Sequence, residues 1–235
     1  MKKLTESFLN ILYPRRCPLC HEILKEQNSL ICETCRKTLH PIEEPRCYKC
    51  GKPVREGEEY CSDCASVQHF YDRGRGIFVY NEKMRQSLVR YKYYGCREYG
   101  DFYSRAMYLY GKNEIALWKP ELIVPVPVHR TKERKRGFNQ SAYLAERISR
   151  YTGIPADLTL VKKIRKTKSQ KKLTVYQRQE NLKKAFCVQH SVSAGRILVV
   201  DDVYTTGSTI DAMARCLKEK GAEKIYFLTV CIGER

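Results

Sequence analysis

Residues 197–209 read ILVVDDVYTTGST, in which four apolar residues precede two aspartates and a run of hydroxyl residues around Gly207. The apolar run predicts a buried strand over Ile197–Val200, and a helical pattern begins near Ser208. Two carboxylates at the end of a buried strand lose hydration, which costs free energy unless they have partners. The stretch therefore predicts a strand, a turn and a helix that together form a binding site.

The turn after this strand has the composition of a phosphate-binding loop. Backbone N–H groups at a helix start face an incoming anion, and a glycine lets the backbone approach the ligand without a Cβ. Helix capping by Thr206 or Ser208 would account for one hydroxyl, but not for the whole set. We expect Asp201 and Asp202 to bind sugar hydroxyls and the following loop to bind a phosphate: Thr205, Thr206, Gly207, Ser208 and Thr209.

Strand-like and helix-like segments alternate from residue 67 onward. This alternation predicts an α/β fold with a mostly parallel sheet covered by helices, in which ligands bind beyond the carboxyl ends of the strands. The predicted strands are 75–81, 121–128, 182–189, 196–202 and 224–231, and the predicted helices are 82–94, 100–117, 138–153 and 208–222.

Eight of the 12 cysteines lie in four C-x-x-C units, separated by 11, 11 and 10 residues. Such paired units are typical of structural zinc sites and of a reducing compartment, so we expect two zinc ions and a cytoplasmic protein. Sequential pairing, favoured because CPLCHEIL and CYKCGKPV look equivalent, gives two ribbons, whereas interleaved pairing would need a cross-brace. The expected ligands are Cys17, Cys20, Cys32 and Cys35 for one site, and Cys47, Cys50, Cys61 and Cys64 for the other.

The zinc ribbons and the preceding residues form a predicted module over residues 1–66, followed by the α/β domain over residues 67–235. Leu4, Phe8, Ile11 and Leu12 share one face of a predicted N-terminal helix. No secretory signal is expected at this end, and no run approaches the roughly 18 apolar residues of a membrane span. His21 and His40 are expected to be bystanders, because eight thiolates complete both metal sites.

Positive charge is concentrated in the second part of the chain, within a formal net charge of +18. RTKERKR (130–136) and KKIRKTKSQKK (162–172) supply much of the excess, and they indicate a polyanionic partner unless they only form a solvated surface. The residues expected to contact nucleic acid, single-stranded DNA above all, are Lys132, Arg134, Lys135, Arg136, Lys162, Lys163, Arg165, Lys166, Lys171 and Lys172.

The motif at 197–209 resembles the phosphoribosyl-pyrophosphate (PRPP) motif of type I phosphoribosyltransferases. IVPVPVHRTKERKRGFNQS (123–141), KTKSQKKLTVYQRQENLKKAF (166–186) and this motif follow one another in the order seen in the ComF family, which also has N-terminal cysteine knuckles. The resemblance covers nearly the whole chain. It implies a type I phosphoribosyltransferase fold, with mostly parallel sheet, plus a small N-terminal zinc-ribbon module, and a role in natural transformation and DNA uptake.

The resemblance also implies roles for individual residues. Asp201 and Asp202 would bind the ribose hydroxyls, the 205–209 loop would bind the 5′-phosphate, and the 166–178 segment, including Lys168, would form a flap. Phe138 of the RGFNQ signature (136–140) is expected to pack in the core, whereas Arg136 could reach a phosphate. PRPP would bind with Mg²⁺, and its pyrophosphate would lie against Val128, His129, Arg130 and Thr131.

Three functions remain open at this stage. The first is a DNA-handling protein that binds PRPP or a nucleotide and holds single-stranded DNA on its basic segments. The second is a PRPP-dependent phosphoribosyltransferase acting on an unidentified base, with Arg130, Lys132, Lys168 and Lys171 neutralising the leaving pyrophosphate. The third is an adaptor whose zinc ribbons dock a DNA-uptake helicase.

Overall fold

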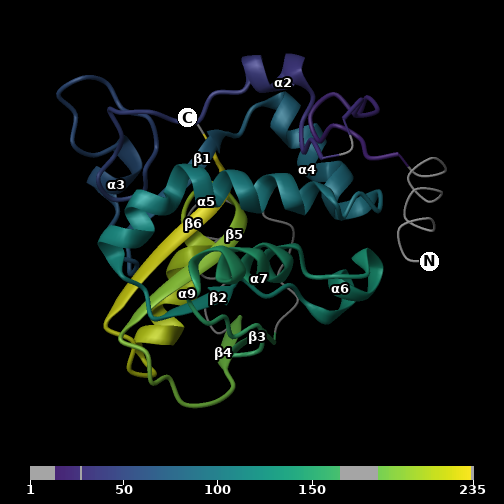
Figure 1. Ribbon diagram of the computed structural model, residues 1–235. Helices are drawn as coiled ribbons and strands as arrows, with labels where there is room; N and C mark the ends of the chain where they lie inside the picture. Colours follow the sequence, from purple (N-terminus) through teal and green to yellow (C-terminus); the bar gives the residue numbers. More distant parts are fainter. Residues whose placement is uncertain (1–13, 27, 165–184, 234–235) are drawn as a thin grey trace.

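The computed structural model describes residues 14–26, 28–164 and 185–233. A parallel sheet of four strands in the order β1-β6-β5-β2 forms its centre (Figure 1). The strands are β1 (Arg73–Val79), β2 (Leu122–Pro125), β5 (Arg196–Tyr204) and β6 (Lys224–Ile232). β5 pairs with β2 on one side and with β6 on the other. The predicted α/β fold with a mostly parallel sheet is therefore confirmed.

Helices cover both faces of this sheet (Figure 1). α4 (Glu82–Tyr93), α5 (Tyr99–Trp118) and α7 (Gln140–Thr152) pack on the face that carries Leu198 and Leu228. α9 (Ser208–Lys218) packs on the face that carries Val199 and Phe227. Because side chains alternate along a strand, each strand of the buried sheet contributes side chains to both hydrophobic cores. None of the helices in the described ranges combines the length and hydropathy that a membrane crossing needs.

Three local predictions differ from the structure. The 182–189 strand does not join the sheet: β4 (Phe186–Val188) pairs antiparallel with β3 (Val161–Lys163), which the sequence analysis missed. The 130–136 run is a helix, α6 (Arg130–Arg136), which is not among the predicted helices. The predicted 196–202 strand continues to Tyr204, because Val203 and Tyr204 still pair with β6. Both aspartates lie within this strand, as the predicted bounds place them.

The cysteine-rich segment contributes to both cores. Cys17 and Cys35 pack with the core under α4 and α5, whereas Cys47 and Cys50 pack with the core under α9. The first part of the segment lies over α4 and the second lies at the β1 edge (Figure 1). The N–H of Gly74 in β1 donates to the Lys49 carbonyl at 2.9 Å, between two of these cysteines. The two predicted parts of the chain thus share their hydrophobic cores.

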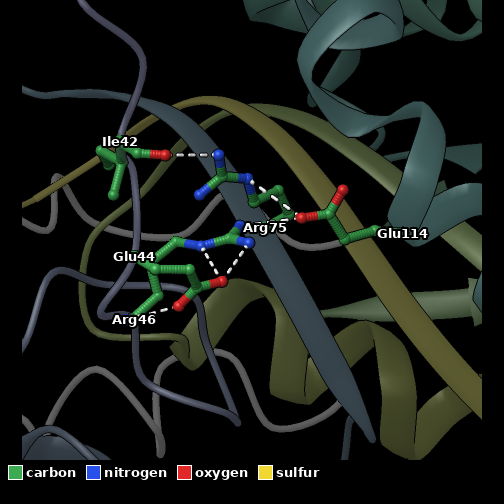
Figure 2. A network of polar contacts seen from close by, with 5 residues as sticks. All are labelled: Ile42, Glu44, Arg46, Arg75 and Glu114. Atoms are coloured by element: carbon green, nitrogen blue, oxygen red, sulfur yellow. Dashed lines mark hydrogen bonds and ion pairs between the residues drawn. The ribbon is translucent and has the colours of Figure 1, made fainter.

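Ion pairs tie residues 42–46 to the sheet and to α5 (Figure 2). Arg75 of β1 is buried and donates from Nη2 to the Ile42 carbonyl at 2.5 Å. Its Nε lies 3.4 Å from Glu114 Oε1, which also accepts from Arg46 Nη1 at 2.8 Å. Burial, and then the charge of Arg46, lowers the pKa of Arg75 to about 10. The Glu114 carboxylate therefore compensates two guanidinium groups, and Arg46 has a second partner in Glu44.

Candidate functional site

The carboxyl end of β5 leads through a turn at Thr205–Gly207 into α9. Gly207, with φ +79°, is the N-cap of α9, and a glycine has no side chain that could cap this helix. Thr206 Oγ1 and Ser208 Oγ instead lie 2.9 Å from each other. The capping alternative is therefore not realised, and the helix start keeps the arrangement expected of an anion site.

Gly207 is closely packed. A Cβ at this position would lie 2.7 Å from Tyr204 Oη and 3.1 Å from His69 Cε1. Its positive φ also disfavours L side chains. Backbone geometry and packing thus both require glycine here, at the centre of the predicted phosphate loop.

Asp201 is 8% exposed and receives two hydrogen bonds at Oδ1. Ser141 Oγ, in the first turn of α7, donates at 2.7 Å, and the Asp202 N–H donates at 2.9 Å. Burial, followed by the neighbouring Asp202 charge, raises the pKa of Asp201 from 3.8 to about 7. The Asp201 carboxyl group therefore changes its charge near neutral pH.

Asp202 is 5% exposed and forms an ion pair with Lys92 near the end of α4. Burial by itself would raise the pKa of Asp202, but Lys92 outweighs it and holds that pKa below its usual value. Burial would likewise lower the pKa of Lys92, and Asp202 outweighs this and raises it. The site thus combines one ionised, paired carboxylate with one carboxyl group that titrates.

Two lysines, Lys163 and Lys132, lie within electrostatic reach of one another on the Asp201 side of the site. Burial lowers the pKa of Lys163 on β3, the nearby charge of Lys132 on α6 lowers it further, and Asp201 opposes both. These three groups are therefore close enough to interact. Lys163, which the sequence analysis assigned to nucleic acid, thus lies near Asp201.

The segment predicted to bind pyrophosphate forms the start of α6. His129 is its N-cap, and His129 Nδ1 accepts from the Thr131 N–H at 3.3 Å and from Thr131 Oγ1 at 2.9 Å. Arg130 is exposed and Val128 is half-buried. The segment begins a helix because the His129 side chain supplies the cap.

The RGFNQ signature has structural roles. Arg136 donates to Gln140 Oε1 at 2.8 Å and to Tyr93 Oη at 2.7 Å, so its hydrogen bonds go to protein groups. Phe138 is 9% exposed and packs edge-to-face on Tyr91, as expected of a core residue. Asn139 caps α7 by accepting from the Ser141 N–H. The signature thus positions α7, and with it the hydroxyl that contacts Asp201.

Two contributors to the site escaped the sequence analysis, namely Lys92 and Ser141. Lys92 follows Met84 and Leu88 at four-residue spacing, so a lysine continues the apolar stripe of α4 and needs an anionic partner. Ser141 offered no comparable signal. Several predicted residues lie outside the described ranges: Arg165, Lys166, Lys168, Lys171 and Lys172.

The remaining predicted nucleic-acid contacts lie on the surface. Lys132, Arg134 and Lys135 are exposed on α6, and Lys162 is exposed on β3. A separate groove of about 960 Å³ lies between the first cysteine group and α4, and it is lined by Arg15, Arg16, Arg85 and Arg90 among others. Within the described residues, the groove at α4 is a basic surface that the sequence analysis did not predict.

The eight C-x-x-C cysteines form two groups in which all Sγ atoms lie within 4.8 Å of one another. Cys20 Sγ and Cys32 Sγ are 3.7 Å apart, and Cys50 Sγ and Cys61 Sγ are 3.6 Å apart. Sulfurs bound at about 2.3 Å to a tetrahedral zinc ion lie about 3.8 Å apart. Both groups therefore fit structural zinc. Their members are Cys17, Cys20, Cys32 and Cys35 in the first tetrad, and Cys47, Cys50, Cys61 and Cys64 in the second tetrad.

The two tetrads repeat one local structure in chain order, as sequential pairing predicts. In each first knuckle a backbone N–H donates back to the first cysteine carbonyl, from His21 to Cys17 and from Gly51 to Cys47, both at 2.9 Å. These equivalent residues both have positive φ. The third cysteine of each tetrad is the N-cap of a short helix, α2 (Glu33–Thr38) or α3 (Ser62–Ser66).

Comparisons with known proteins agree with this architecture. Residues 8–65 match the family described as double zinc ribbon domain, and residues 139–235 match the phosphoribosyl transferase domain. Competence protein F of Haemophilus influenzae is 30% identical over 89% of this chain and 93% of its own length. Competence protein ComFC of Bacillus subtilis is 30% identical over 84% and 82%, and DNA utilization protein YhgH of Escherichia coli is 28% identical over 93% and 97%. The chain therefore belongs to the ComF family and joins a double zinc ribbon to a domain of the phosphoribosyltransferase type.

Proposed function

We propose that this protein binds PRPP together with Mg²⁺ at the carboxyl end of β5 and handles DNA during uptake. The observation that carries the ligand assignment is the buried Asp201–Asp202 pair directly before a helix start capped by Gly207. Carboxylates accept hydrogen bonds from ribose hydroxyls, and the helix start favours a phosphate. The two halves of the site thus match the two ends of a ribose 5-phosphate.

The pyrophosphate of PRPP is assigned to the side of the site that holds Lys132 and Lys163, with the 128–131 segment beside them. The Lys163 charge interacts with those of Lys132 and Asp201. Mg²⁺ bound to the diphosphate would neutralise part of its charge. Transfer of the phosphoribosyl group to a base is the second candidate function. In that reaction a nitrogen of the base forms a bond to C1 and loses its proton to water, while the C1–O bond to pyrophosphate breaks and these lysines stabilise the charge on the leaving group.

PRPP affinity is expected to increase about tenfold from pH 6 to pH 8, because ribose hydroxyls donate to the ionised form of a carboxyl with a pKa of about 7. Calorimetric titration of PRPP with Mg²⁺ across this range tests both the binding and its pH dependence. PRPP itself also titrates in this range, so Asp201→Asn serves as the matched control, with a flatter profile. Absence of binding, or equal slopes for both proteins, would contradict the assignment.

The raised pKa also affects the stability of the ligand-free protein, with the opposite sign. The folded-state pKa of Asp201 lies above the unfolded value of 3.8. The contribution of its proton to stability is therefore fully present below about pH 4 and is lost as the pH rises through about 7. A PRPP-dependent gain in stability is consequently best measured above pH 7.

A DNA-handling role rests on the relatives, which are named for competence and DNA utilization, and on the basic surfaces of this chain. Arg134 and Lys135 are exposed on α6, whereas the Arg136 guanidinium donates a hydrogen bond to Tyr93. The basic groove at α4 offers a second surface, with the exposed ring of Tyr94 on its wall. Arginine and aromatic side chains together suit a single-stranded phosphate backbone and its bases.

Single-stranded DNA is expected to bind with an affinity that falls linearly on a logarithmic salt scale. Replacing Arg134 and Lys135 by glutamine should reduce the slope by about 1.4, since each phosphate contact contributes about 0.7. Fluorescence anisotropy at several salt concentrations measures the slope. The matched control, Lys112→Gln with Lys220→Gln, removes two exposed charges away from α6, one from α5 and one from the turn after α9. Equal slopes for both double variants would remove α6 from the DNA surface.

An adaptor role for the ribbons is compatible with this proposal. Tyr48 and Tyr60 of the second ribbon are 57% and 48% exposed and contact each other edge-to-face at 6.2 Å. An exposed aromatic pair of this kind suits a protein partner, such as a DNA-uptake helicase.

A further inference from the structure

A chain of buried hydroxyl groups connects the second tetrad with the predicted phosphate loop. Cys64 Sγ lies 3.9 Å from Tyr71 Oη, which lies 2.7 Å from Tyr204 Oη. A metal-bound thiolate only accepts hydrogen bonds, so Tyr71 donates to the sulfur and Tyr204 donates to Tyr71. Because Tyr204 is the last residue of β5, the contact reaches the residue directly before the loop.

The loop rests on this chain of hydroxyls. A Cβ on Gly207 would meet Tyr204 Oη at 2.7 Å, so the Gly207 backbone packs directly against that hydroxyl. The Tyr204 ring stacks on Phe227 at 4.7 Å, and the Tyr71 ring meets Phe227 edge-on at 5.0 Å. Both tyrosine rings are therefore held by the sheet, and their hydroxyl positions define the space available to Gly207.

A second connection runs through the residues that follow α3. Asp211, in the first turn of α9, accepts from the Phe70 N–H at 2.9 Å and from His69 Nδ1 at 2.6 Å. The His69 ring stacks on Tyr71 at 4.7 Å. The start of α9 is thus connected to the second ribbon by two sets of contacts, one through Asp211 and one through the Tyr71–Tyr204 pair.

The first tetrad makes contacts of a different kind. Its Pro18 carbonyl accepts from Ser87 Oγ of α4, and its Leu19 carbonyl accepts from Arg90 of the same helix. Cys17 and Cys35 also belong to the core on that face of the sheet. The chain therefore contains two similar metal sites, of which the second is built against the phosphate loop.

We propose that the second tetrad, through Tyr71 and Tyr204, positions the phosphate loop. Metal in the second tetrad then sets the affinity of the loop for a phosphate ligand, and metal in the first tetrad does not. This inference rests on the proposed function for the identity of the ligand. The part of the inference that concerns how rigidly the loop is held depends only on the contacts described above.

Tyr71→Phe tests the hydroxyl connection while it keeps the ring. We expect PRPP with Mg²⁺ to bind at least fivefold more weakly in calorimetry, and amide hydrogens of residues 204–212 to exchange faster in the ligand-free protein. Tyr103→Phe is the matched control: Tyr103 is equally buried, and its hydroxyl contacts Ser87 in the other core. The control should change neither quantity, although it also loses a buried hydroxyl group.

Cys64→Ser and Cys35→Ser test the metal dependence at equivalent positions of the two tetrads. Each variant should retain one zinc ion by metal analysis, but only Cys64→Ser should weaken PRPP binding and loosen the 204–212 segment. Equal effects of the two serine variants, or unchanged exchange and affinity in Tyr71→Phe, would overturn the inference. If the unaltered protein fails to bind PRPP, the proposed function is wrong, and hydrogen exchange still decides the positioning role.

Discussion

Replacing Asp202 by asparagine is expected to weaken PRPP binding by about 100-fold and to reduce folding stability by about 3 kcal/mol. The affinity falls because the ionised acceptor for a ribose hydroxyl is lost. The stability falls because Lys92 keeps its charge at a partly buried position and loses its carboxylate partner. Calorimetry with PRPP and Mg²⁺, together with urea unfolding, measures the two effects separately.

The double variant Lys92→Met with Asp202→Asn separates a ligand contact from a structural ion pair. Removing both charges should restore most of the lost stability, because no unpaired cation remains. The affinity should stay low, because the carboxylate is still absent. Recovery of PRPP binding in the double variant would show that Asp202 only balances Lys92 and does not contact the ligand.

Removal of zinc is expected to lower the melting temperature by more than about 15 °C, since structural zinc contributes about 10 kcal/mol in small zinc domains. The effect should reach the whole protein because cysteines of both tetrads belong to the two hydrophobic cores. Thermal unfolding followed by circular dichroism, with and without a strong chelator, measures the shift. Metal analysis of the purified chain should give about two zinc ions.

A cysteine substitution makes this test specific to the tetrads. Cys50→Ser removes a fully buried ligand and should reduce the zinc content to one ion per chain. Cys187→Ser changes a cysteine of β4 outside both tetrads and should leave two ions in place. Unchanged zinc content in Cys50→Ser would contradict the assignment of this tetrad.

Local patterns in the sequence were sufficient for the central unit of the fold. The apolar run at 197–200 predicts β5 because a strand buried on both faces needs apolar side chains at every position. The four C-x-x-C units predict both tetrads because two residues between cysteines suit one metal-binding knuckle. Each of these signals lies within a short stretch of chain, so it does not depend on tertiary contacts.

Other parts of the site depend on contacts between distant segments. Lys92 and Asp202 are far apart in the sequence, and only the packing of α4 on the sheet brings them together. The pairing of β3 with β4 links residues 161–163 to 186–188 across a long interval, so the sequence predicted the second strand but neither β3 nor the pairing. α6 was missed because the 130–136 run was considered only for its charge, whereas the His129 side chain caps it as a helix.

The shared cores bear on how this architecture can be rearranged. Each ribbon supplies apolar surface to a different face of the same sheet, through Leu19 on one side and Ile42 on the other. An α/β domain separated after residue 66 would lose these contacts on both faces of the sheet. Apolar side chains of both cores would then be exposed to water. The cysteine-rich segment therefore cannot be replaced by another module without changing both cores. A recombination event that joined this ribbon to an unrelated sheet would also have to supply matching surfaces for two separate cores.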